Sequence, residues 1–267
     1  MCLIIFAHQA IPDLPLVVAA NRDEFYARPT RSAQFWSEDG AENNILAGKD
    51  LQAGGTWLGI TRSGRFAAVT NIRDPSQTEP RPRSRGELTL NFLRSDKPAA
   101  DYADTLRQSF AEYAGYNLLL SDGKAFYYVN NVEALSRELE PGIYGLSNGL
   151  LNNDWPKVLR GQRGLENLLN SGAELNPDQL IELMANREQA ADAELPNTGL
   201  PRELEKRLSS AFITDDSRGY GTLCSTAIIQ DRAGHIRFSE QNYSAAGTAT
   251  ENCFFSFTRS AHVPEKV

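Results

Sequence analysis

Long apolar runs are absent from this sequence of 267 residues. No run approaches the roughly 20 residues that a membrane-spanning helix needs, and the first residues lack the basic segment and small-residue cleavage site of a secretory signal. Cysteine is also scarce, with three residues and no CxxC spacing, which argues against a disulfide framework or a structural zinc site. We therefore expect a cytoplasmic protein with free thiols and no transmembrane segment.

Basic charge is scarce as well. The 27 lysines and arginines are outnumbered by 34 aspartates and glutamates, which gives a net charge of −7 at pH 7. Nucleic-acid binding depends on neutralising phosphates, so we expect no nucleic-acid partner. The sequence also lacks a phosphate-binding GxxxxGK(S/T) loop, a GxGxxG segment after a strand, an HExxH helix and an EF-hand loop. Each absence removes one common class of nucleotide or metal site.

Short apolar runs of strand length are present, and they come in pairs. Four pairs are separated by turn residues and predict β-hairpins: 2–8 with 16–21, 56–61 with 66–71, 116–121 with 125–130, and 223–230 with 235–241. Helical patterns lie between them at residues 86–94, 98–114, 155–171, 177–187 and 201–212. Hairpins interrupted by blocks of helices favour an α+β fold in which helices cover two stacked antiparallel sheets. We expect residues 1–267 to form a single domain, with 252–267 as an edge strand and polar tail.

The first predicted hairpin brings a cysteine next to a polar quartet. If its loop is centred near residue 12, antiparallel partners have residue numbers that sum to about 24. Cys2 then lies opposite Arg22 and beside Asn21 and Asp23. The polar residues that end one strand are therefore predicted to lie next to the thiol that begins the other.

A cysteine at a free N-terminus supplies both a nucleophile and a base, because its own α-amine has a pKa near 8. A carboxylate such as Asp23 could orient the ammonium form, and the amides of Asn71 or Asn148 could donate to the oxyanion of a tetrahedral intermediate. This arrangement would perform acyl transfer or amide hydrolysis. The residues alone leave a second interpretation open, in which Cys2 is incidental and residues 21–24 form a strand end held by surface salt bridges.

Met1-Cys2 followed by Asn21-Arg22-Asp23-Glu24 resembles the NRDE family, also called the transport and Golgi organization 2 family. The resemblance extends through most of the chain in ordered segments: AGGTWLGI at 53–60, TNIRDP at 70–75, SRGEL at 84–88, YNLLLSD at 116–122, GLSNG at 145–149, LPNTG at 195–199 and SSAFI at 209–213. This family is similar to N-terminal-nucleophile (Ntn) hydrolases, especially the cysteine enzymes that cleave penicillin V and conjugated bile acids. The resemblance implies an αββα four-layer sandwich.

The resemblance also implies a hydrolase site at four positions of this chain. Cys2 matches the nucleophile, Asp23 its acidic partner, Asn71 the asparagine of the oxyanion site and Asn148 the second asparagine. The α-amine of Cys2 can act as a base only if Met1 is removed, because a retained methionine acylates it.

Two cations of the hydrolase pattern lack a clear match. Those enzymes carry an arginine three residues before the acid, where this sequence has Ala20, and Arg22 lies on the opposite strand face under strict alternation. A later arginine has an uncertain counterpart in Arg207 or Lys206. Loss of a cation beside a thiolate raises the thiol pKa and lowers its reactivity. The sequence therefore leaves open whether the protein is an enzyme.

The resemblance implies a ligand as well. NRDE proteins are associated with intracellular heme trafficking and have been connected with acyl-CoA and lipid handling. Heme and acyl-CoA are both amphipathic and anionic, and the arginine fork pairs with carboxylates and phosphates. The expected ligand-binding residues lie at and around the NRDE strand end: Asn21, Arg22, Asp23, Glu24, Arg28, Arg73 and Arg85.

A bound heme would use an axial iron ligand, and the candidates are Cys2, His8 and His235. About 20 Å of extended chain separates Cys2 from His8, so these two cannot hold one iron from opposite sides. The leading hypothesis is a heme-trafficking protein whose ligand is held near Cys2 and the NRDE strand end. The alternatives are a Cys2-dependent amidohydrolase or acyltransferase acting on a small acylated substrate, and a binder of acyl-CoA or another lipid.

Overall fold

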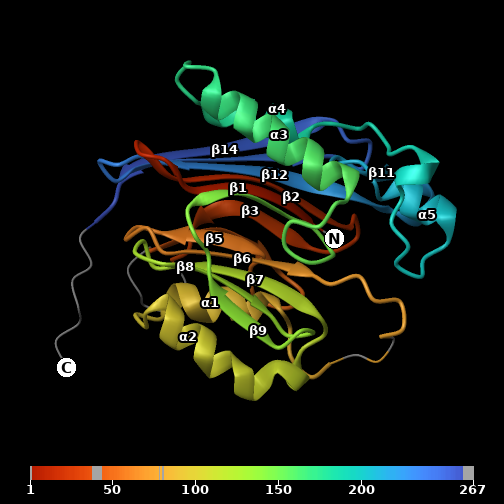
Figure 1. Cartoon of the computed structure of the whole chain (residues 1–267), viewed down its shortest axis with the longest axis horizontal. Helices are drawn as coiled ribbons and strands as arrows, with labels where there is room; N and C mark the ends of the chain where they lie inside the picture. The colour runs from red at the N-terminus through yellow and green to blue at the C-terminus, as the bar shows by residue number, and fades with distance from the viewer. Residues whose placement is uncertain (1, 38–43, 78, 80, 261–267) are drawn as a thin grey trace.

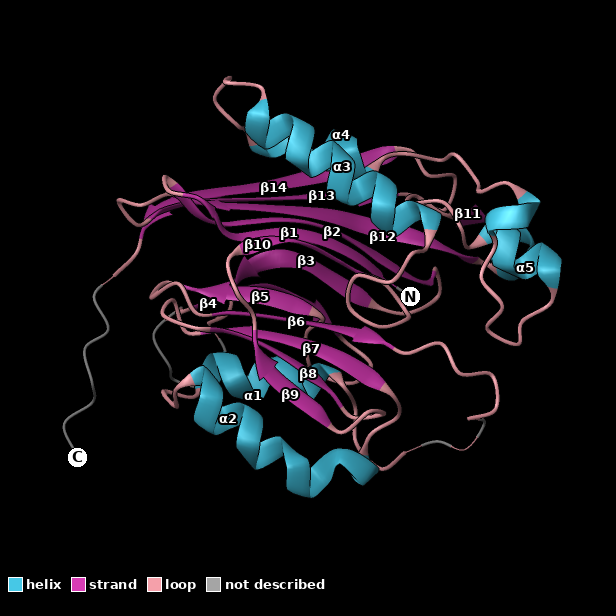
Figure 2. Cartoon of the chain, viewed as in Figure 1, coloured by secondary structure: helices cyan, strands magenta, loops and turns pink. Residues whose placement is uncertain are grey.

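The chain folds into four layers, with two stacked β-sheets between two layers of helices (Figures 1 and 2). The structure is a computed structural model, and it describes residues 2–37, 44–77, 79 and 81–260. The predicted polar tail from residue 261 onward and the position of Met1 lie outside the described residues. The α+β four-layer sandwich predicted from the sequence is confirmed.

Sheet A carries the N-terminal strand. Its strands are β1 (Cys2–Ile11), β2 (Leu14–Phe25), β10 (Gly142–Leu146), β11 (Thr214–Asp215), β12 (Tyr220–Gln230), β13 (His235–Tyr243) and β14 (Ala249–Thr258). They lie in the order β10-β1-β2-β12-β13-β14, β11 pairs with β12, and every pair is antiparallel. The central position of β1 and β2 places the first hairpin in the middle of the sheet.

Sheet B is built from the next part of the chain. Its strands are β3 (Thr30–Phe35), β4 (Ile45–Asp50), β5 (Leu58–Thr61), β6 (Phe66–Asn71), β7 (Tyr116–Ser121), β8 (Phe126–Asn130) and β9 (Leu135–Glu138). They follow one another in chain order across the sheet, with antiparallel pairing throughout. This simple meander needs only local connections, apart from the helical segment between β6 and β7.

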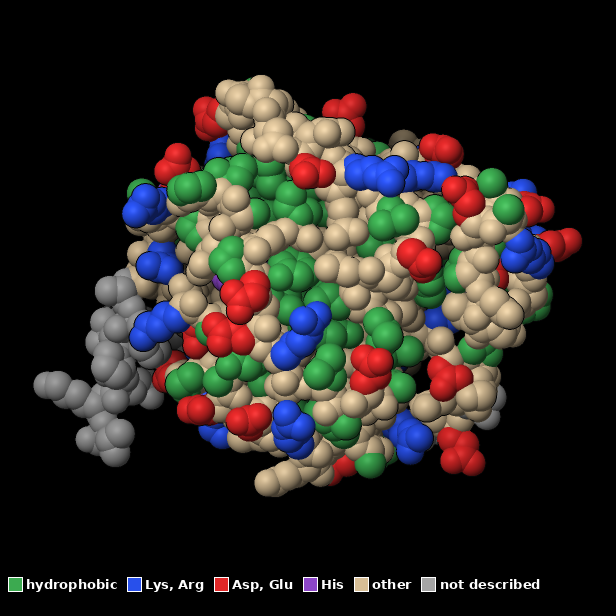
Figure 3. Space-filling model, viewed as in Figure 1, with side chains coloured by type: hydrophobic (Ala, Val, Ile, Leu, Met, Phe, Trp, Pro, Cys, Tyr) green, Lys and Arg blue, Asp and Glu red, His purple; other side chains and the backbone are tan. Residues whose placement is uncertain are grey.

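Helices cover both outer faces. The helices are α1 (Gly86–Arg94), α2 (Ala99–Leu106), α3 (Pro156–Asn170), α4 (Pro177–Met184) and α5 (Arg202–Arg207). The first two pack on sheet B and the next two on sheet A, while α5 lies beside β11 at one end of the sandwich (Figure 1). None of these helices is long and apolar enough to cross a membrane. On the face in Figure 3, acidic and basic side chains are interspersed.

Alternating side chains of β1 fill two different core layers. Ile4 and Phe6 point between the sheets, whereas Leu3 and Ile5 pack beneath α3 and α4. Successive side chains of a strand point to opposite faces, so a strand buried on both faces reads as a continuous apolar run. The run LIIFA in β1 has this character. A third core layer lies between sheet B and its helices.

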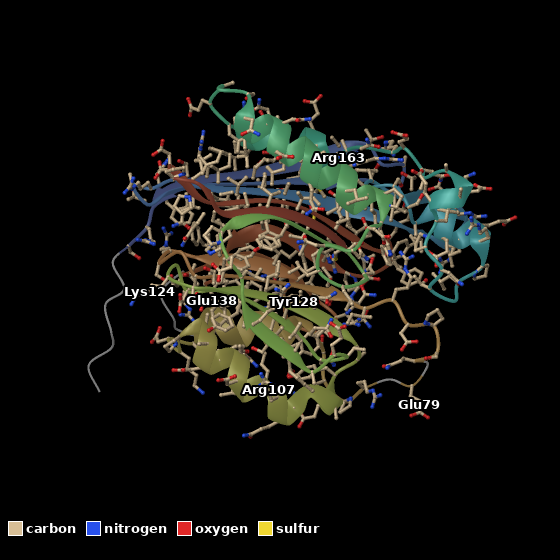
Figure 4. All side chains as sticks on the ribbon, in the orientation of Figure 1. Glu79, Arg107, Lys124, Tyr128, Glu138 and Arg163 are labelled. Carbon is tan, nitrogen blue, oxygen red and sulfur yellow. The ribbon has the colours of Figure 1, made fainter. Side chains whose placement is uncertain are left out.

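A buried polar network fixes the loop that follows β10. Asn117 donates to the carbonyl of Gly149 at 2.8 Å and accepts hydrogen bonds from Tyr128 Oη at 2.7 Å and Asn130 Nδ2 at 2.8 Å. Tyr128 lies inside the sandwich in Figure 4, whereas Arg107 lies on an outer layer. Because these buried polar groups bond to one another, the network holds Gly149 of the 147–149 loop in one position.

Two predicted helices are shorter than expected. The pattern at 98–114 forms α2, which is followed by a 3-10 helix over Arg107–Glu112. Side-chain hydroxyls tighten the turns there, since Ser109 Oγ donates to the Leu106 carbonyl three residues earlier. The pattern at 201–212 forms only α5. The chain leaves the helix there because the Phe212 N–H donates to the Asn186 carbonyl and the Leu208 carbonyl accepts from Lys157.

Gly161 allows α3 to approach β1 closely. A Cβ added there would lie 2.6 Å from side-chain atoms of Ile5. We expect Gly161→Ala to lower the free energy of unfolding by about 1–3 kcal/mol through overpacking, although alanine favours a helix by about 1 kcal/mol. Urea denaturation measures the free energy of unfolding. Adding Ile5→Val to the Gly161→Ala chain should restore part of the lost stability. A Gly161→Ala protein more stable than wild type would contradict this account of the packing.

Candidate functional site

The central strands of sheet A bring the predicted site residues to one end of the sandwich. Cys2 of β1 is the cross-strand partner of Arg22 of β2, as the hairpin register predicts. On the other side of β2, Arg22 pairs with Cys224 and Asp23 with Thr222, across a β-bulge in β12. Cys2 and the NRDE quartet therefore share one strand end, which lies toward β11 and α5 in Figure 1.

Alternation divides the NRDE quartet between two faces of sheet A. Asn21 and Asp23 point toward the helical layer, whereas Arg22 points the same way as Ala20, which belongs to the core between the sheets. Directly opposed residues of an antiparallel pair project to the same face, so Cys2 and Arg22 face sheet B together. Arg22 and Asp23 lie on opposite faces, but the face of Arg22 is also that of Ala20 and of the thiol. The expectation that its strand face prevents Arg22 from standing in for the arginine missing at position 20 is therefore wrong.

Asn21 has a structural role in the folded chain. Its Nδ2 donates to the carbonyls of Met184 at 2.8 Å and Ala211 at 2.9 Å, and its Oδ1 accepts from Ser225 Oγ at 2.6 Å. Both amide hydrogens and the side-chain oxygen are thus engaged within the buried interior. The structure does not direct Asn21 toward a ligand: this side chain joins β2 to the end of α4 and to the segment before β11.

Arg22 places a buried cation beside the thiol although position 20 is alanine. Its guanidinium carbon lies 4.1 Å from the centroid of the Trp57 ring, and Nη1 donates to Thr30 Oγ1 at 2.6 Å. These contacts hold the side chain on the inner face, where it is buried. A cation is therefore present on the Cys2 face, two residues further along β2 than the position that the resemblance to hydrolases implies.

The Cys2 thiol is partly buried at the head of β1. Removal from water raises its pKa above the usual cysteine value, and the Asp23 carboxylate also raises it. A hydrogen bond from the Asp23 backbone N–H and the charge of Arg22 lower it, without reversing the net direction. The thiol is therefore protonated at neutral pH, and Cys2 needs a nearby base to act as a nucleophile.

Asp23 is a buried carboxylate held between strands. Thr222 Oγ1 donates to Asp23 Oδ1 at 2.7 Å, and the Tyr220 hydroxyl donates to the Asp23 backbone carbonyl at 2.9 Å. Burial is the largest influence and raises the pKa of the Asp23 carboxyl above its usual value, although the charge of Lys157 and the Thr222 hydrogen bond lower it. A carboxylate fixed in this way next to the head of β1 can orient an ammonium group there.

The two predicted oxyanion asparagines lie in contact. Asn148 Nδ2 donates to the backbone oxygen of Asn71 at 2.9 Å and to its side-chain oxygen at 3.0 Å. The adjacent Ser147 donates from Oγ to the Cys2 carbonyl at 3.0 Å, which joins this loop to the head of β1. Since Asn148 engages the oxygen of the Asn71 side chain, the NH₂ group of Asn71 is the donor that this pair can offer to an oxyanion.

Three partly exposed residues lie at this strand end, namely Glu24, Arg28 and Arg85. We call these three residues the rim. Arg28 donates from Nε at 3.1 Å and from Nη2 at 2.6 Å to Asp50 Oδ2, and it lies 3.9 Å from Glu24. Arg85 Nη1 donates to the Gly115 carbonyl at 3.3 Å. Burial lowers the pKa of Arg85, whereas the thiolate form of Cys2 and the Glu24 carboxylate raise it, so the guanidinium lies within electrostatic reach of the thiol.

Arg73 belongs to a buried ion pair below the rim. Its Nη1 bonds to Glu205 of α5, its guanidinium lies 4.7 Å from the Trp155 ring centroid, and its backbone N–H donates to the Asn148 carbonyl at 2.7 Å. Thr198 donates to the same carboxylate. The structure thus directs Arg73 to an internal carboxylate, and the residue ties α5 to the asparagine loop.

Lys157 was missed by reasoning from the sequence. It lies in the first turn of α3, is 3% exposed, and donates from Nζ to the Leu208 carbonyl at 3.0 Å. Desolvation lowers its pKa to about 8, while the carboxylate of Asp23 opposes this shift. In the sequence it follows Trp155-Pro156 as an ordinary charged residue at a helix start, and no motif marks it.

The two histidine candidates lie at the other end of sheet A. His8 contacts the ring of Phe126 at 5.0 Å between centroids, in the space between the sheets. His235 begins β13, and its Nε2 lies 2.8 Å from Ser256 Oγ. Of the three proposed axial ligands, Cys2 alone lies at the NRDE strand end. In the described ranges, no group of three or more His, Cys, Asp or Glu side chains is arranged to hold a metal ion.

The fold of the chain is that of Ntn-hydrolase-like proteins. An N-acylethanolamine-hydrolyzing acid amidase ortholog from Caenorhabditis elegans has a similar structure, with a TM-score of 0.50 over 85% of this chain and 92% of that chain. The two sequences are 9% identical, so this likeness concerns the fold alone.

The sequence then places the chain in one family. Residues 1–245 match the family described as Transport and Golgi organisation 2. The Bos taurus Transport and Golgi organization protein 2 homolog is 36% identical over 260 residues, which cover 91% of this chain and 93% of the bovine protein. The Homo sapiens homolog is 35% identical with the same coverage. The chain belongs to the Transport and Golgi organisation 2 family.

Breaking the buried ion pair should cost far more stability than breaking a surface pair. Arg73→Met leaves Glu205 as an unbalanced buried charge, and we expect a loss of about 3–5 kcal/mol in the free energy of unfolding. Arg83→Met removes a more exposed arginine paired with Glu87 and Glu112, and it should cost about 1 kcal/mol or less. Urea denaturation of both variants tests this, and Glu205→Gln should relieve part of the Arg73→Met loss. Equal losses for the two arginine variants would show that the internal pair is not as buried as described.

Proposed function

We propose that the protein binds an acylated small molecule at the Cys2 end of sheet A and hydrolyses or transfers its acyl group through Cys2. The observation that carries this proposal is that β1, β2 and β6 bring four groups to one end of the sandwich. They are the Cys2 thiol, the Arg22 cation facing it, the fixed carboxylate of Asp23 and the amide of Asn71. A nucleophile, a cation, an orienting acid and an oxyanion donor are the groups that acyl transfer requires.

The chemistry begins with the α-amine of Cys2, which removal of Met1 would free. The amine takes the thiol proton, and the sulfur attacks the carbonyl carbon while the C=O electron pair moves to oxygen, next to the Asn71 amide. When the intermediate collapses, the amine or alcohol leaving group departs with the proton of the α-ammonium and a thioester remains. Water, deprotonated by the α-amine, then attacks the thioester, releases the carboxylic acid and restores the thiol.

The rim favours a substrate with an anionic end. Within the part of the chain that the structure describes, Arg85 bonds to a neutral carbonyl and forms no ion pair with a carboxylate. The charge of Arg28, by contrast, is matched by Asp50. A carboxylate or phosphate on the substrate would supply the missing partner for Arg85, because guanidinium pairs with both groups in a planar, bidentate manner.

A carrier of heme is the second candidate, and the joint presence of Arg85 and Cys2 at one strand end favours it. Heme propionates would pair with the arginine, and the thiolate would serve as a single axial ligand. The raised pKa of the Cys2 thiol opposes thiolate ligation at neutral pH, and for this reason we rank acyl chemistry first. A binder of acyl-CoA would use the same rim, with its phosphates at Arg85 and no bond to sulfur.

The direct test is hydrolysis of a p-nitrophenyl fatty ester by the chain with Met1 removed. We expect Cys2→Ala to reduce turnover at least about a thousandfold and Asn71→Ala to reduce it about a hundredfold. Cys253→Ala, which changes a partly exposed cysteine on β14, serves as the matched control and should leave turnover unchanged. Similar rates for wild type and Cys2→Ala would exclude the proposal.

A hemin titration followed by absorbance tests the carrier. A saturable band near one equivalent that Arg85→Ala weakens, together with no ester turnover, would support heme carriage over acyl chemistry. Turnover that depends on Cys2, without a saturable heme band, is the result that we expect.

A further inference from the structure

The strand β14 is an edge of sheet A, and it lacks the features that usually protect an edge. Within the described part of the chain, β13 is its one pairing partner. It has ten residues without proline or lysine, and its pairing with β13 is regular from Asn252 to Thr258. The run CFFSFT at 253–258 contains three phenylalanines and no charge. A long, regular, apolar edge strand presents a row of backbone groups to which another strand can bond.

The other three sheet edges are protected. β10, at the opposite edge of sheet A, has five residues and packs against α3. β9 has four residues, of which Arg137 and Glu138 are charged. β3 contains Arg31, and an irregularity interrupts its pairing with β4. Short strands, charges and bulges all discourage the addition of a further strand, so β14 is the edge that remains open to one.

The helical layer over sheet A leaves the outer face of β14 open. α3 packs on β1 and β10, and α4 packs on β2, β12 and β13 (Figure 2). Phe254 is the cross-strand partner of Ser239, so its side chain points to the helical side of the sheet. It is 57% exposed, the largest exposed fraction among the large apolar side chains of the described residues. The open edge therefore carries an exposed aromatic ring.

The pairing of β14 with β13 shows which backbone groups point outward. The Arg259 N–H donates to the Gly234 carbonyl at 2.7 Å, one step beyond the last pair of the ladder. In an antiparallel pair, residues that bond to the partner strand alternate with residues whose N–H and C=O groups point away from it. The residues that direct these groups away from β13 are therefore the even-numbered ones: Asn252, Phe254, Ser256 and Thr258.

A second copy of β14 fits this edge. When two identical strands pair antiparallel around a two-fold axis, the residue numbers of opposed residues have a constant sum. Outward-facing groups of both strands meet only when that sum is even. The register centred on Phe255 meets this condition, because it sets Phe254 opposite Ser256 of the other copy. The same register sets Asn252 opposite Thr258.

Charge favours this register. It sets Glu251 of each copy opposite Arg259 of the other, and opposed residues of opposite charge stabilise a strand pair. Glu251 accepts from the neutral Ser32 Oγ at 2.6 Å, and among the described residues neither Glu251 nor Arg259 has an ion-pair partner. The neighbouring register, centred on Phe254, would set Glu251 opposite the apolar Phe257. In the register centred on Phe255, the two Phe254 rings are diagonal neighbours on the outer face, within reach of each other.

We propose that two copies of the chain associate through β14, antiparallel around Phe255, so that sheet A continues from one copy into the other. β14 begins at the end of sheet A where Cys2 lies, so the two Cys2 sites would lie at opposite ends of the joined sheet. The association is therefore separate from the proposed acyl chemistry. An interface formed mainly by one strand of each copy belongs to the small class, below about 1,200 Å², and we expect a dissociation constant in the micromolar range.

Sedimentation velocity of the wild-type chain is the first test, and it does not depend on how any variant folds. Between about 1 and 200 µM we expect a change from monomer to dimer without larger species, because a two-fold contact uses the edge of each copy once. Hydrogen exchange at the even-numbered backbone amides of 252–258 should be slower at the higher concentration. A chain that stays monomeric throughout this range would overturn the inference, as would a dimer whose β14 amides exchange at the monomer rate.

A lysine on the open edge should prevent the association. Phe254→Lys places a charge where a second strand would approach, and it should raise the dissociation constant at least about tenfold. Val132→Lys is the matched control, since Val132 is 55% exposed in the turn between β8 and β9 and should leave the dissociation constant unchanged. Equal weakening by the two lysines would show that the contact does not lie at β14.

Charge reversal tests the register. Glu251→Lys and Arg259→Glu each bring like charges together, and because the two-fold axis repeats the contact, each should raise the dissociation constant about three- to tenfold. The double variant restores opposite charges at both places and should return the dissociation constant close to the wild-type value. A double variant that associates no better than the single variants would overturn the register centred on Phe255.

Discussion

The antiparallel register of β1, β2 and β12 is the constraint on which the site depends. It sets Cys2 opposite Arg22 and Asp23 opposite Thr222, and strand alternation then fixes which side chains face sheet B and which face the helices. A slip of one residue would exchange the two faces, expose the thiol to the helical layer and bury apolar residues on the wrong side. The packing of Ile4 and Phe6 between the sheets therefore also determines the chemistry at the head of β1.

The architecture could be predicted from the sequence because the long central strands carry strong patterns. All four predicted hairpins are confirmed, together with the edge strand near Cys253. The sequence does not predict the strands β3, β4, β9, β10 and β11. Of these, β3 and β9 are polar strands at the edges of sheet B, and β10 is a short edge strand of sheet A. β4 contains a glycine and two charged residues, and β11 has only two residues. The length of α5 depends on hydrogen bonds with residues far away in the chain, which no local pattern reveals.

The candidate site could be predicted only in part. The sequence gives the pairing of Cys2 with Arg22 and the proximity of Asp23, since both follow from one short hairpin. It does not give the internal partners of Asn21 and Arg73, because these belong to segments more than 100 residues away. For the same reason it does not identify Lys157, whose burial depends on the packing of α3 on sheet A and not on its neighbours in the chain.

The central claim is that the thiol at the head of β1 accepts an acyl group. The most direct measurement is the mass of the N-terminal peptide after the Met1-free chain has been mixed briefly with a p-nitrophenyl fatty ester and quenched in acid. The account predicts an added acyl mass on Cys2 that neutral hydroxylamine removes, as expected for a thioester. An N-terminal peptide of unchanged mass, from protein that still consumes the ester, would contradict it.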